Sequence, residues 1–535
     1  MAQTTEPASA GSAQQVFTRR SSGLIRTAGT YDVFIFNIGL ISVGIAVALN
    51  QFIGPAFYPG ANVALSSLIA TAGMLVVAVA YYMWSITFPR SGGNYVYQSR
   101  AISPGVAFAT TFTESIVLMF YAALAASLLV SVGLSSFFGV LGFITETESL
   151  ADAAIWLGEP FGLFVIGSLV ILFCGLLPLY GMRRYFTFQR GMFIVAIVGT
   201  VVTLAVMLLG SRETFVGNFE ELTGLEYARV IDTAISNGWA DVGYAAGPTI
   251  AFLVWPLLPL LGGIQSIGIG GEIKNVSKGQ FMGMLGSIAS AGLVFALFAV
   301  LANKTFGYEF QAAVVFNGDV APDATTPVTP YFTLLAGILT NNVVLTVLIV
   351  AAFVAWIYFW IPAELIYAQR TMVAWSFDRL GPEKLGYVSP RFHTPVVAIL
   401  VTVILSVGFM WVIAYTTYGT LVLIYGILIC WGATMLGGVF FPWLRKDMFE
   451  RSPVSRWKVG GIPLMSVFCL ASLAFFGWVF YLLWNDPIAA GHDPIDIWPI
   501  VAMTVAGAIW YGVTRWYRQR QGLRVELAFR EIPIE

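Results

Sequence analysis

The sequence predicts an all-α polytopic membrane protein with 12 transmembrane helices, and two observations carry that prediction. First, the chain is 58% apolar and only 10% charged, with a mean hydropathy of +0.81. A soluble domain is about 45–50% apolar and about 25% charged. Second, if each apolar run crosses the membrane in turn, one membrane topology places all but three of the 27 Lys and Arg residues on the same side. Most of the chain is therefore expected to lie in the lipid bilayer.

The spans are read from uncharged runs, because a helix needs about 20 apolar residues to cross the hydrocarbon. Residues 33–89 hold two helices split near Pro59 and Asn62, and residues 392–444 hold two more that turn near Thr416. One span each is predicted at about 104–137, 161–181, 188–210, 248–271, 281–303, 343–369, 460–484 and 496–514. The long connection at 211–247 contains a short segment that is expected to form a surface helix.

The distribution of basic residues predicts the orientation of the chain. The exceptions to the one-sided pattern are Arg212, Arg229 and Lys304. Because cytoplasmic loops are enriched in Lys and Arg, both termini are expected in the cytoplasm of a multi-pass cell-membrane protein. The first 30 residues are polar and lack the apolar core of a signal peptide, so they are expected to form a mobile tail.

Two spans contain helix-breaking residues at mid-depth. Span one carries Ile41-Ser42-Val43-Gly44-Ile45, and span six carries Pro256, Pro259 and the pair Gly262-Gly263. Proline removes a helical hydrogen bond and glycine weakens a helix. In lipid, the freed backbone groups are tolerated where they line a cavity or bind something. Breaks five spans apart are those expected of an inverted repeat with a central binding site, although membrane helices also use Gly and Pro for close packing.

Four segments resemble the amino acid-polyamine-organocation permease family. The first is PRSGGNYVYQSRAISPGVAF, Pro89 to Phe108, between spans two and three. The others are SVGI at Ser42 to Ile45, GGEIKN at Gly270 to Asn275, and the loop from Arg370 to Ala398 after span eight. These segments agree with the family in order and spacing over about two thirds of the chain. As a set they are specific for the family and weak for the substrate.

The resemblance implies a LeuT-type fold, with a 5+5 inverted repeat, broken helices 1 and 6, and two extra helices. The chain would then begin with a cytoplasmic N-tail (1–30), a first repeat (31–210) and an outer loop (211–247). A second repeat (248–444), the two extra helices with their preceding cytoplasmic loop (445–517) and a cytoplasmic C-tail (518–535) would follow. It also implies secondary active transport of amino acids or related amines by alternating access, driven by H⁺ or by exchange.

The resemblance further implies a main-chain binding site at the two breaks. The backbone amides of Ser42 to Ile45 would receive the substrate carboxylate, because a helix N-terminus presents free amides and a positive dipole. Carbonyls near Ile41 and Leu260 to Gly262 would receive the ammonium group. The substrate-binding residues expected on this basis are Ile41, Ser42, Val43, Gly44, Ile45, Leu260, Leu261, Gly262, Gly263 and Gln265.

The chain departs from the family pattern at two places. Leu258 and Leu260 occupy the register in which many members carry an aromatic gate, and Trp255 lies one turn earlier. Ala196 falls where some proton-coupled members have a lysine in span five. The absence of that cation leaves room for Na⁺ coupling, with the ion expected between spans one and eight.

Three carboxylates in or near the membrane are candidates for coupling, because intramembrane charges are costly and often functional. Glu364 precedes Arg370 by six residues, so it is expected about 9 Å inward from the cytoplasmic end of span eight. Proton coupling would explain it, and so would a carboxylate that reaches a cytoplasmic water cavity or pairs with a basic loop residue. Glu114, in span three, is expected to be satisfied by neighbouring hydroxyl groups, and Asp32 to cap the start of span one.

Other classes of function fit the sequence less well. An amino acid symporter coupled to Na⁺ is the main alternative within the fold. A membrane-embedded enzyme needs a cluster of ionisable or metal-binding residues, yet His393 and His492 lie in loops on opposite sides. A channel is not supported, because the sequence contains no filter motif. No metal, cofactor or nucleic acid is expected; the partners are the substrate, H⁺ or Na⁺ and the bilayer. Substrate identity, transport direction and oligomeric state are left open.

Overall fold

The computed structural model describes residues 23–529, except residues 241, 421, 422, 487, 489–491 and 524. Within these residues, 12 helical segments are long and apolar enough to cross a membrane, as the sequence predicts. They are Thr30–Phe57, Val63–Thr87, Pro104–Thr145, Pro160–Tyr180, Met182–Leu209, Ala246–Gly268, Val276–Thr305, Val343–Phe377, Val396–Tyr415, Ile424–Leu444, Leu464–Trp484 and Pro494–Arg520. The expected tail at residues 1–22 and the last six residues of the C-tail lie outside the described part of the chain.

Several spans consist of more than one helix. Span one comprises α1 (Thr30–Ile41) and α2 (Val43–Phe57), and span six comprises α12 (Ala246–Ala251), α13 (Val254–Leu260) and a 3₁₀ segment. Spans three and seven contain π-helical turns, between α5 (Pro104–Leu128) and α6 (Ser135–Thr145) and between α14 (Val276–Gln280) and α15 (Ser287–Thr305). The other spans are α3 (Val63–Thr87), α8 (Pro160–Leu176) with a 3₁₀ turn, α9 (Met182–Leu209), α18 (Val343–Phe377), α19 (Val396–Tyr415), α20 (Ile424–Leu444), α22 (Leu464–Trp484) and α23 (Pro494–Arg520).

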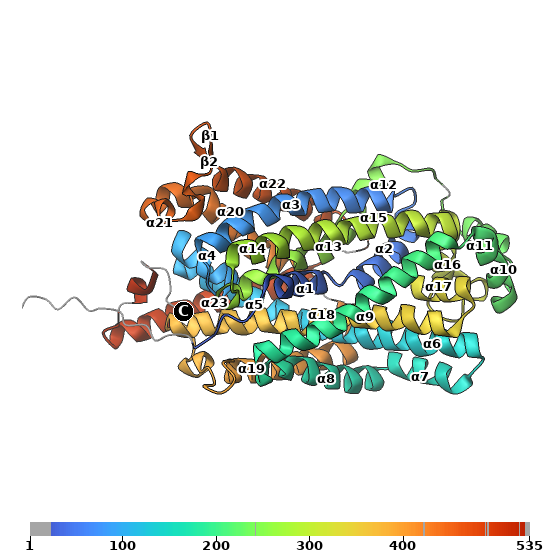
Figure 1. Ribbon diagram of the computed structural model, residues 1–535, viewed down its shortest axis with the longest axis horizontal. Coiled ribbons are helices and arrows are strands. Elements are labelled where there is room, and N and C mark those ends of the chain that lie inside the picture. The colour runs from blue at the N-terminus through green and yellow to red at the C-terminus, as the bar shows by residue number, and fades with distance from the viewer. Residues whose placement is uncertain are drawn as a thin grey trace, which may run out of the picture.

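Shorter elements cover the two ends of the bundle (Figure 1). One end carries α4 (Gly93–Ala101), α21 (Lys446–Glu450) and a hairpin of β1 (Lys458–Val459) and β2 (Ile462–Pro463). Near the other end lie α7 (Glu148–Gly158), α10 (Arg212–Thr223), α11 (Tyr227–Ser236), α16 (Tyr308–Val320) and α17 (Phe332–Thr340). The predicted surface helix is α11, whereas α10, α16 and α17 were not predicted.

Contacts at the two ends agree with the membrane topology predicted from the sequence. We call the end that carries α4 and α21 the inner end. There the amides of Thr27 and Ala28 donate to the Glu272 carbonyl at 2.9 and 3.0 Å, and Arg518 of α23 approaches Glu383 at 3.4 Å. At the opposite, outer end, Arg212 donates to the Asn303 carbonyl at 2.8 Å. Segments from the N-terminal part, the loops and the C-terminal part of the chain therefore meet at one end.

Spans one and six are interrupted where the sequence predicts. Ser42 adopts a left-handed conformation, with φ 52° and ψ 63°, and separates α1 from α2. In span six the α-helix ends at Leu260 and continues as a 3₁₀ helix over Leu261–Gly268. The two interruptions pack together, because a Cβ built on Gly262 would lie only 2.8 Å from the Leu40 carbonyl carbon. Only glycine permits so close an approach of the two backbones.

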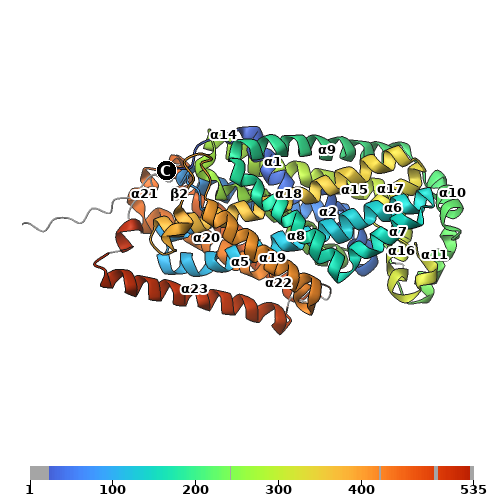
Figure 2. The same cartoon turned by 90° about the horizontal axis from the view of Figure 1, so that it is seen from below.

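The interrupted spans are also among the most buried. In the most apolar window of span one 89% of residues are buried, and in that of span six 72%, compared with 11% in the last span. Figure 2 shows α23 along one edge of the bundle. Burial lets side chains satisfy the freed backbone: Asn37 accepts from the Ser266 amide at 3.0 Å and donates to the Ser266 hydroxyl at 2.9 Å. The relation of the two halves by inversion stays a prediction.

The boundary predicted for span eight is wrong. Helix α18 continues from residue 369 to Phe377, so Arg370, assigned to a loop, lies in the helix and is fully buried. Its guanidinium is 2.7 Å from the Glu272 carboxylate. Arg100, also assigned to a loop, is buried on α4 and lies 2.9 Å from Asp378. Each charge is tolerated because it has a partner of opposite sign.

We expect Glu272→Gln to destabilise the protein by about 3–5 kcal/mol, because it leaves the buried Arg370 guanidinium without a counter-charge. The measurement is the thermal unfolding midpoint of the purified protein in detergent. Glu450→Gln is the control, since Glu450 forms an exposed pair with Lys446 at 3.7 Å and such pairs contribute about 0–1 kcal/mol. Equal midpoints for the two variants would show that the buried pair does not stabilise the inner end.

Candidate functional site

A cavity of about 280 Å³ lies at the centre of the bundle, beside the interruptions of spans one and six. It receives side chains from spans one, three, six, eight and ten. These are Leu40, Ile41, Ile45, Ala46, Leu49, Asn50, Tyr121, Leu124, Leu128, Trp255, Leu258, Pro259, Leu261, Gly262, Gln265, Trp360, Glu364, Ile424 and Ile427. Its size is just below the range of about 300–1,000 Å³ typical of ligand pockets, so it suits a small metabolite.

Half of the residues predicted to bind substrate line this cavity. They are Ile41, Ile45, Leu261, Gly262 and Gln265. Val43 and Gly44 instead line a separate hollow of about 20 Å³ toward α9 and α18. Ser42, Leu260 and Gly263 are buried beside the break and line neither space. The binding site therefore stays a prediction: five of its ten residues line the cavity, and Ser42, Val43, Gly44, Leu260 and Gly263 do not.

The backbone at the start of α2 has the properties that the sequence suggested. The Ala46 amide donates to the Ser42 carbonyl at 3.1 Å, which begins the hydrogen-bond ladder of α2. The amides of Val43, Gly44 and Ile45 precede it, and the first amides of a helix have no acceptor within the helix. They point along the helix axis toward the break, whichever way their side chains point. The start of α2 can therefore receive an anionic group.

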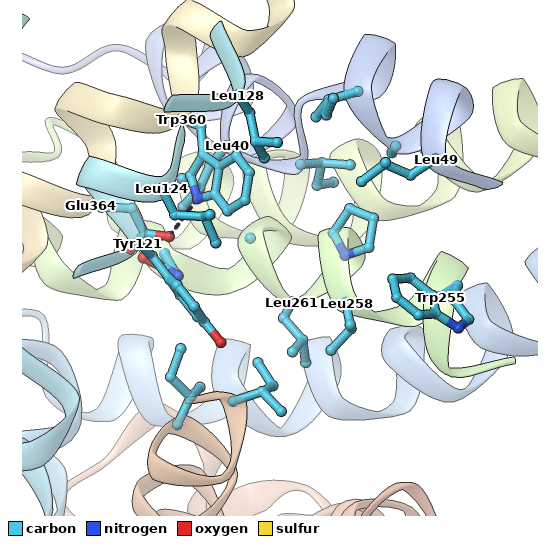
Figure 3. Close-up of a pocket in the computed structure, with 18 of the residues that line it drawn as sticks. Leu40, Leu49, Tyr121, Leu124, Leu128, Trp255, Leu258, Leu261, Trp360 and Glu364 are labelled. Atoms are coloured by element: carbon cyan, nitrogen blue, oxygen red, sulfur yellow. Dashed lines mark hydrogen bonds between the residues drawn. The ribbon is translucent and has the colours of Figure 1, made fainter. Parts of the chain in front are cut away.

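Several polar groups lie together at one end of a largely apolar cavity. Figure 3 shows Glu364, Trp360 and Tyr121 together, with Trp255 at the opposite end. The Trp360 indole donates to Glu364 Oε1 at 2.9 Å, and Gln265 lines the same cavity. Glu364 Oε2 and Gln265 Oε1 are buried without a hydrogen-bond partner. No Lys, Arg or His is among the residues that line the cavity, so Glu364 lacks a cationic partner there.

Glu364 lies deeper than its distance from Arg370 suggested. Because α18 runs 13 residues past it to Phe377, the carboxylate is about 20 Å from the inner end of the helix, at 1.5 Å per residue. The expectation of about 9 Å assumed that the span ended at Arg370. The pairing with a basic loop residue is therefore excluded for this structure, and Glu364 is a wall of the central cavity.

Glu114 and Asp32 lie away from the cavity and have full sets of partners. Glu114 accepts hydrogen bonds from Asn94 at 2.7 Å and Trp431 at 2.8 Å, and from Tyr367 at 3.3 Å. The Ser and Thr hydroxyl groups next to Glu114 in the sequence, which were predicted to satisfy it, do not bond its carboxylate. Asp32 accepts from the Gly29 amide at 2.9 Å, as a capping residue should, and also from Arg190 at 2.7 Å.

An aromatic side chain closes the outer end of the cavity, although it is not in the expected register. Leu258 lines the cavity, Leu260 does not, and the aromatic group is supplied by Trp255 one turn earlier. The Trp255 indole donates to the Tyr58 hydroxyl at 2.8 Å, and Tyr58 donates to the buried carboxylate of Asp486. Burial and Asp486 raise the pKa of Tyr58, so the hydroxyl stays a neutral donor. This chain of bonds ties spans one and six to the loop after α22.

Trp356 of α18 packs between spans one and eight, beside the hollow of about 20 Å³ that Val43 and Gly44 line. Its indole donates to the Thr200 hydroxyl of α9 at 2.8 Å, and its carbonyl accepts from the Ser42 hydroxyl at 2.8 Å. A Cβ on Gly44 would lie 3.0 Å from the Trp356 side chain, so the packing is close. No group of three or more His, Cys, Asp or Glu that could hold a metal was found among the described residues.

Apart from Glu364, the sequence did not identify the cavity side chains from spans three, eight and ten. Tyr121, Trp360 and Ile424 belong to helices that are apolar on every side, because one face meets lipid and the other meets protein. Hydrophobic periodicity therefore does not distinguish their cavity faces. Asn50 of span one could have been identified from the sequence, because an amide side chain in an apolar helix indicates a polar contact. Both of its polar atoms are buried without partners beside the cavity.

We expect Gly262→Ala to lower stability by about 1–3 kcal/mol through overpacking, because the new methyl would meet the Leu40 and Ile41 backbones at 2.8–2.9 Å. Thermal unfolding midpoints measure this loss. Gly477→Ala in α22 is the matched control, since nothing lies within 4 Å of its added Cβ and the change should stabilise the helix by at most about 1 kcal/mol. A Gly262→Ala protein as stable as the control would mean that spans one and six do not pack so closely.

Comparison with known protein families agrees with this geometry. The family model described as amino acid permease matches residues 29–510, which include all 12 spans except the end of the last. The match extends well beyond the four segments that carried the resemblance. It also excludes the enzyme and channel alternatives, because permeases are transporters. The chain belongs to the amino acid permease family.

Proposed function

We propose that this protein moves an amino acid or a related amine across the cell membrane by alternating access, with the substrate held in the central cavity. The observation that carries the proposal is the position of that cavity, enclosed between the interruptions of spans one and six in a chain of the amino acid permease family. Binding at mid-membrane beside discontinuous helices is the arrangement that secondary transporters use.

The substrate's α-amino and α-carboxyl groups are bound by main chain in this proposal. The amides of Val43, Gly44 and Ile45 at the start of α2 receive the carboxylate. The carbonyls of Ile41 and of the stretch from Leu260 to Gly262 receive the ammonium group. Ile41 and Gly262 line the cavity, which supports this placement. Val43 and Gly44 participate only through the backbone, since the Val43 side chain faces the separate hollow and Gly44 has no side chain.

The remaining walls of the cavity favour an apolar substrate side chain. Leu49, Leu124, Leu128, Ile424 and Ile427 surround the space, and basic residues are absent from its lining. Removing apolar surface from water stabilises a complex by about 25 cal/mol per Å², whereas a charged side chain loses its hydration. Neutral amino acids with branched or aromatic side chains are thus the preferred class, and acidic amino acids the least favoured.

Coupling to H⁺, or exchange, is better supported than coupling to Na⁺. Glu364 is a carboxyl group in the wall of the cavity with an unpartnered oxygen, so it can take up and release a proton next to the substrate. Transporters coordinate Na⁺ with several oxygens of unwound backbone. Trp356 packs between spans one and eight, and its carbonyl and indole are already hydrogen-bonded to Ser42 and Thr200, which disfavours a Na⁺ site there.

The inner end is assigned to the cytoplasm in this proposal. The inner end holds the described basic residues that the predicted topology places on one side. Because cytoplasmic loops carry an excess of Lys and Arg, this side is the cytoplasmic one. The same assignment places both tails in the cytoplasm. Residues 31–210 and 248–444 then form the two inverted repeats, and α22 and α23 are the added helices.

Reconstituted into liposomes, the wild-type protein should accumulate labelled neutral apolar amino acids more readily than acidic ones, because of the apolar lining. The experiment uses a panel of labelled amino acids and polyamines, with imposed pH and Na⁺ gradients in separate runs. Empty liposomes are the control. Enzymatic turnover or ion conductance without movement of any of these compounds would contradict the proposed function.

Glu364→Gln should abolish acceleration by a pH gradient and retain exchange of substrate across the membrane. The amide resembles the protonated carboxyl group in shape but cannot release a proton, and exchange does not require proton release in each half-cycle. Glu383→Gln is the control, because its side chain is 76% exposed and lies at the inner end, away from the cavity. Full pH-gradient stimulation in Glu364→Gln would remove this residue from coupling, and stimulation of the wild type by Na⁺ alone would reject coupling to H⁺.

A further inference from the structure

A second cavity, of about 640 Å³, lies at the inner end and is separate from the central one. We call it the inner crevice. It is formed by the segment before α1, the connection between α8 and α9, and the loop before α19. Its lining residues are Ile25, Thr27, Tyr180, Gly181, Met182, Arg183, Arg184, Glu272, Arg391, Phe392 and His393. Proposed transport through the central cavity uses none of these residues.

The inner crevice is positively charged. Arg183, Arg184 and Arg391 contribute three cations, and no carboxylate of the described residues forms a salt bridge with any of them. Glu272 is the acidic residue of the lining, and its charge is balanced by Arg370 at 2.7 Å. His393 also lines the crevice, with Nδ1 3.1 Å from the Gly23 carbonyl. The positive charge of the inner crevice therefore favours the binding of an anion.

The start of α9 adds a second attraction for an anion. This helix runs for 28 residues from Met182, and its N-cap residue, Gly181, offers no side chain to its first amides. Gly181 has φ +99°, a conformation that L side chains rarely adopt. Free amides and the positive end of the helix dipole thus face the same space as the arginines. Guanidinium groups and helix N-termini together are the groups that bind phosphate in proteins.

The depth of the inner crevice matches the surface of a bilayer. Within α9, the side chains of Ile194, Val198 and Val201 are 63%, 49% and 59% exposed, as lipid-facing residues of a span should be. Arg183 and Arg184 precede this apolar surface by about two to three turns of the helix. Basic pockets between helices at the cytoplasmic surface are suited to anionic lipid headgroups.

We propose that the inner crevice binds a phosphate-bearing anion, with the headgroup of an anionic phospholipid as its source. The bound phosphate contacts Arg183 and Arg184 at the start of α9 and Arg391 in the loop before α19, and it joins these two parts to the rest of the crevice wall. That wall includes the segment before α1, where the Thr27 and Ala28 amides already donate to the Glu272 carbonyl at 2.9 and 3.0 Å. Occupancy thus holds the inner end together and stabilises the protein. This inference does not depend on the identity of the transported substrate.

The test measures binding and thermal stability of the full-length protein, without any transport assay. The probes are short-chain phosphatidylglycerol, phosphatidylcholine of the same chain length, and inorganic phosphate. The test variant is Arg183→Gln with Arg184→Gln. The matched control is Arg451→Gln with Arg456→Gln, which removes two exposed arginines from the same end but outside the crevice.

Phosphatidylglycerol should bind the wild type and the control alike and raise their unfolding midpoints, while the test variant should bind about 30-fold more weakly. Phosphatidylcholine should have no such effect. Competition by inorganic phosphate at millimolar concentration would support the site and identify a free phosphate compound as its source. Equal losses in test and control variants, or no binding of either phosphate probe by the wild type, would overturn the proposal.

Discussion

Every feature of this structure depends on one constraint: a backbone that leaves the α-helical ladder inside a membrane must be shielded from lipid. The chain meets this constraint by placing its two interruptions against each other at the centre of the bundle. Gly262 lies against the backbone of Leu40 and Ile41, and the Asn37 amide supplies bonds to Ser266 beyond the second break. The same arrangement leaves the free amides of α2 beside an enclosed cavity, where a zwitterion can replace the missing acceptors. Shielding and binding thus have a single origin.

The inner end is held together by charges that do not face lipid. Asp32 joins span one to Arg190 of span five, and Glu272 at the exit of span six joins Arg370 of span eight. Arg370 and Glu272 are both buried, and breaking such a pair costs several kcal/mol because an uncompensated charge remains, whereas Arg190 is half exposed. The proposed alternating access would have to move these partners as units, or separate them only when water enters. A phosphate in the inner crevice would add to the same set of contacts.

The outer end is held differently. Trp255 closes the cavity and reaches Asp486 through the Tyr58 hydroxyl, so the link consists of hydrogen bonds rather than ion pairs. Because Asp486 follows α22, an added helix takes part in the closure of the outer end. The two ends thus differ in the kind of contact that joins their spans, ion pairs at the inner end and hydrogen bonds at the outer end. Glu364 and Tyr121 lie between these ends, in the wall of the cavity.

The sequence by itself determined the number of spans, the segregation of basic residues and the places where spans one and six are interrupted. Each of these follows from local composition, because lipid excludes charge and unpaired backbone along the whole length of a span. Tertiary structure alone decided which side chains meet. The facing of Tyr121 and Trp360, the partners of Glu114 and the packing of Trp356 between spans one and eight depend on helix rotation. A helix that is apolar on every side encodes no rotation in its hydrophobic pattern, so only packing against its neighbours determines it.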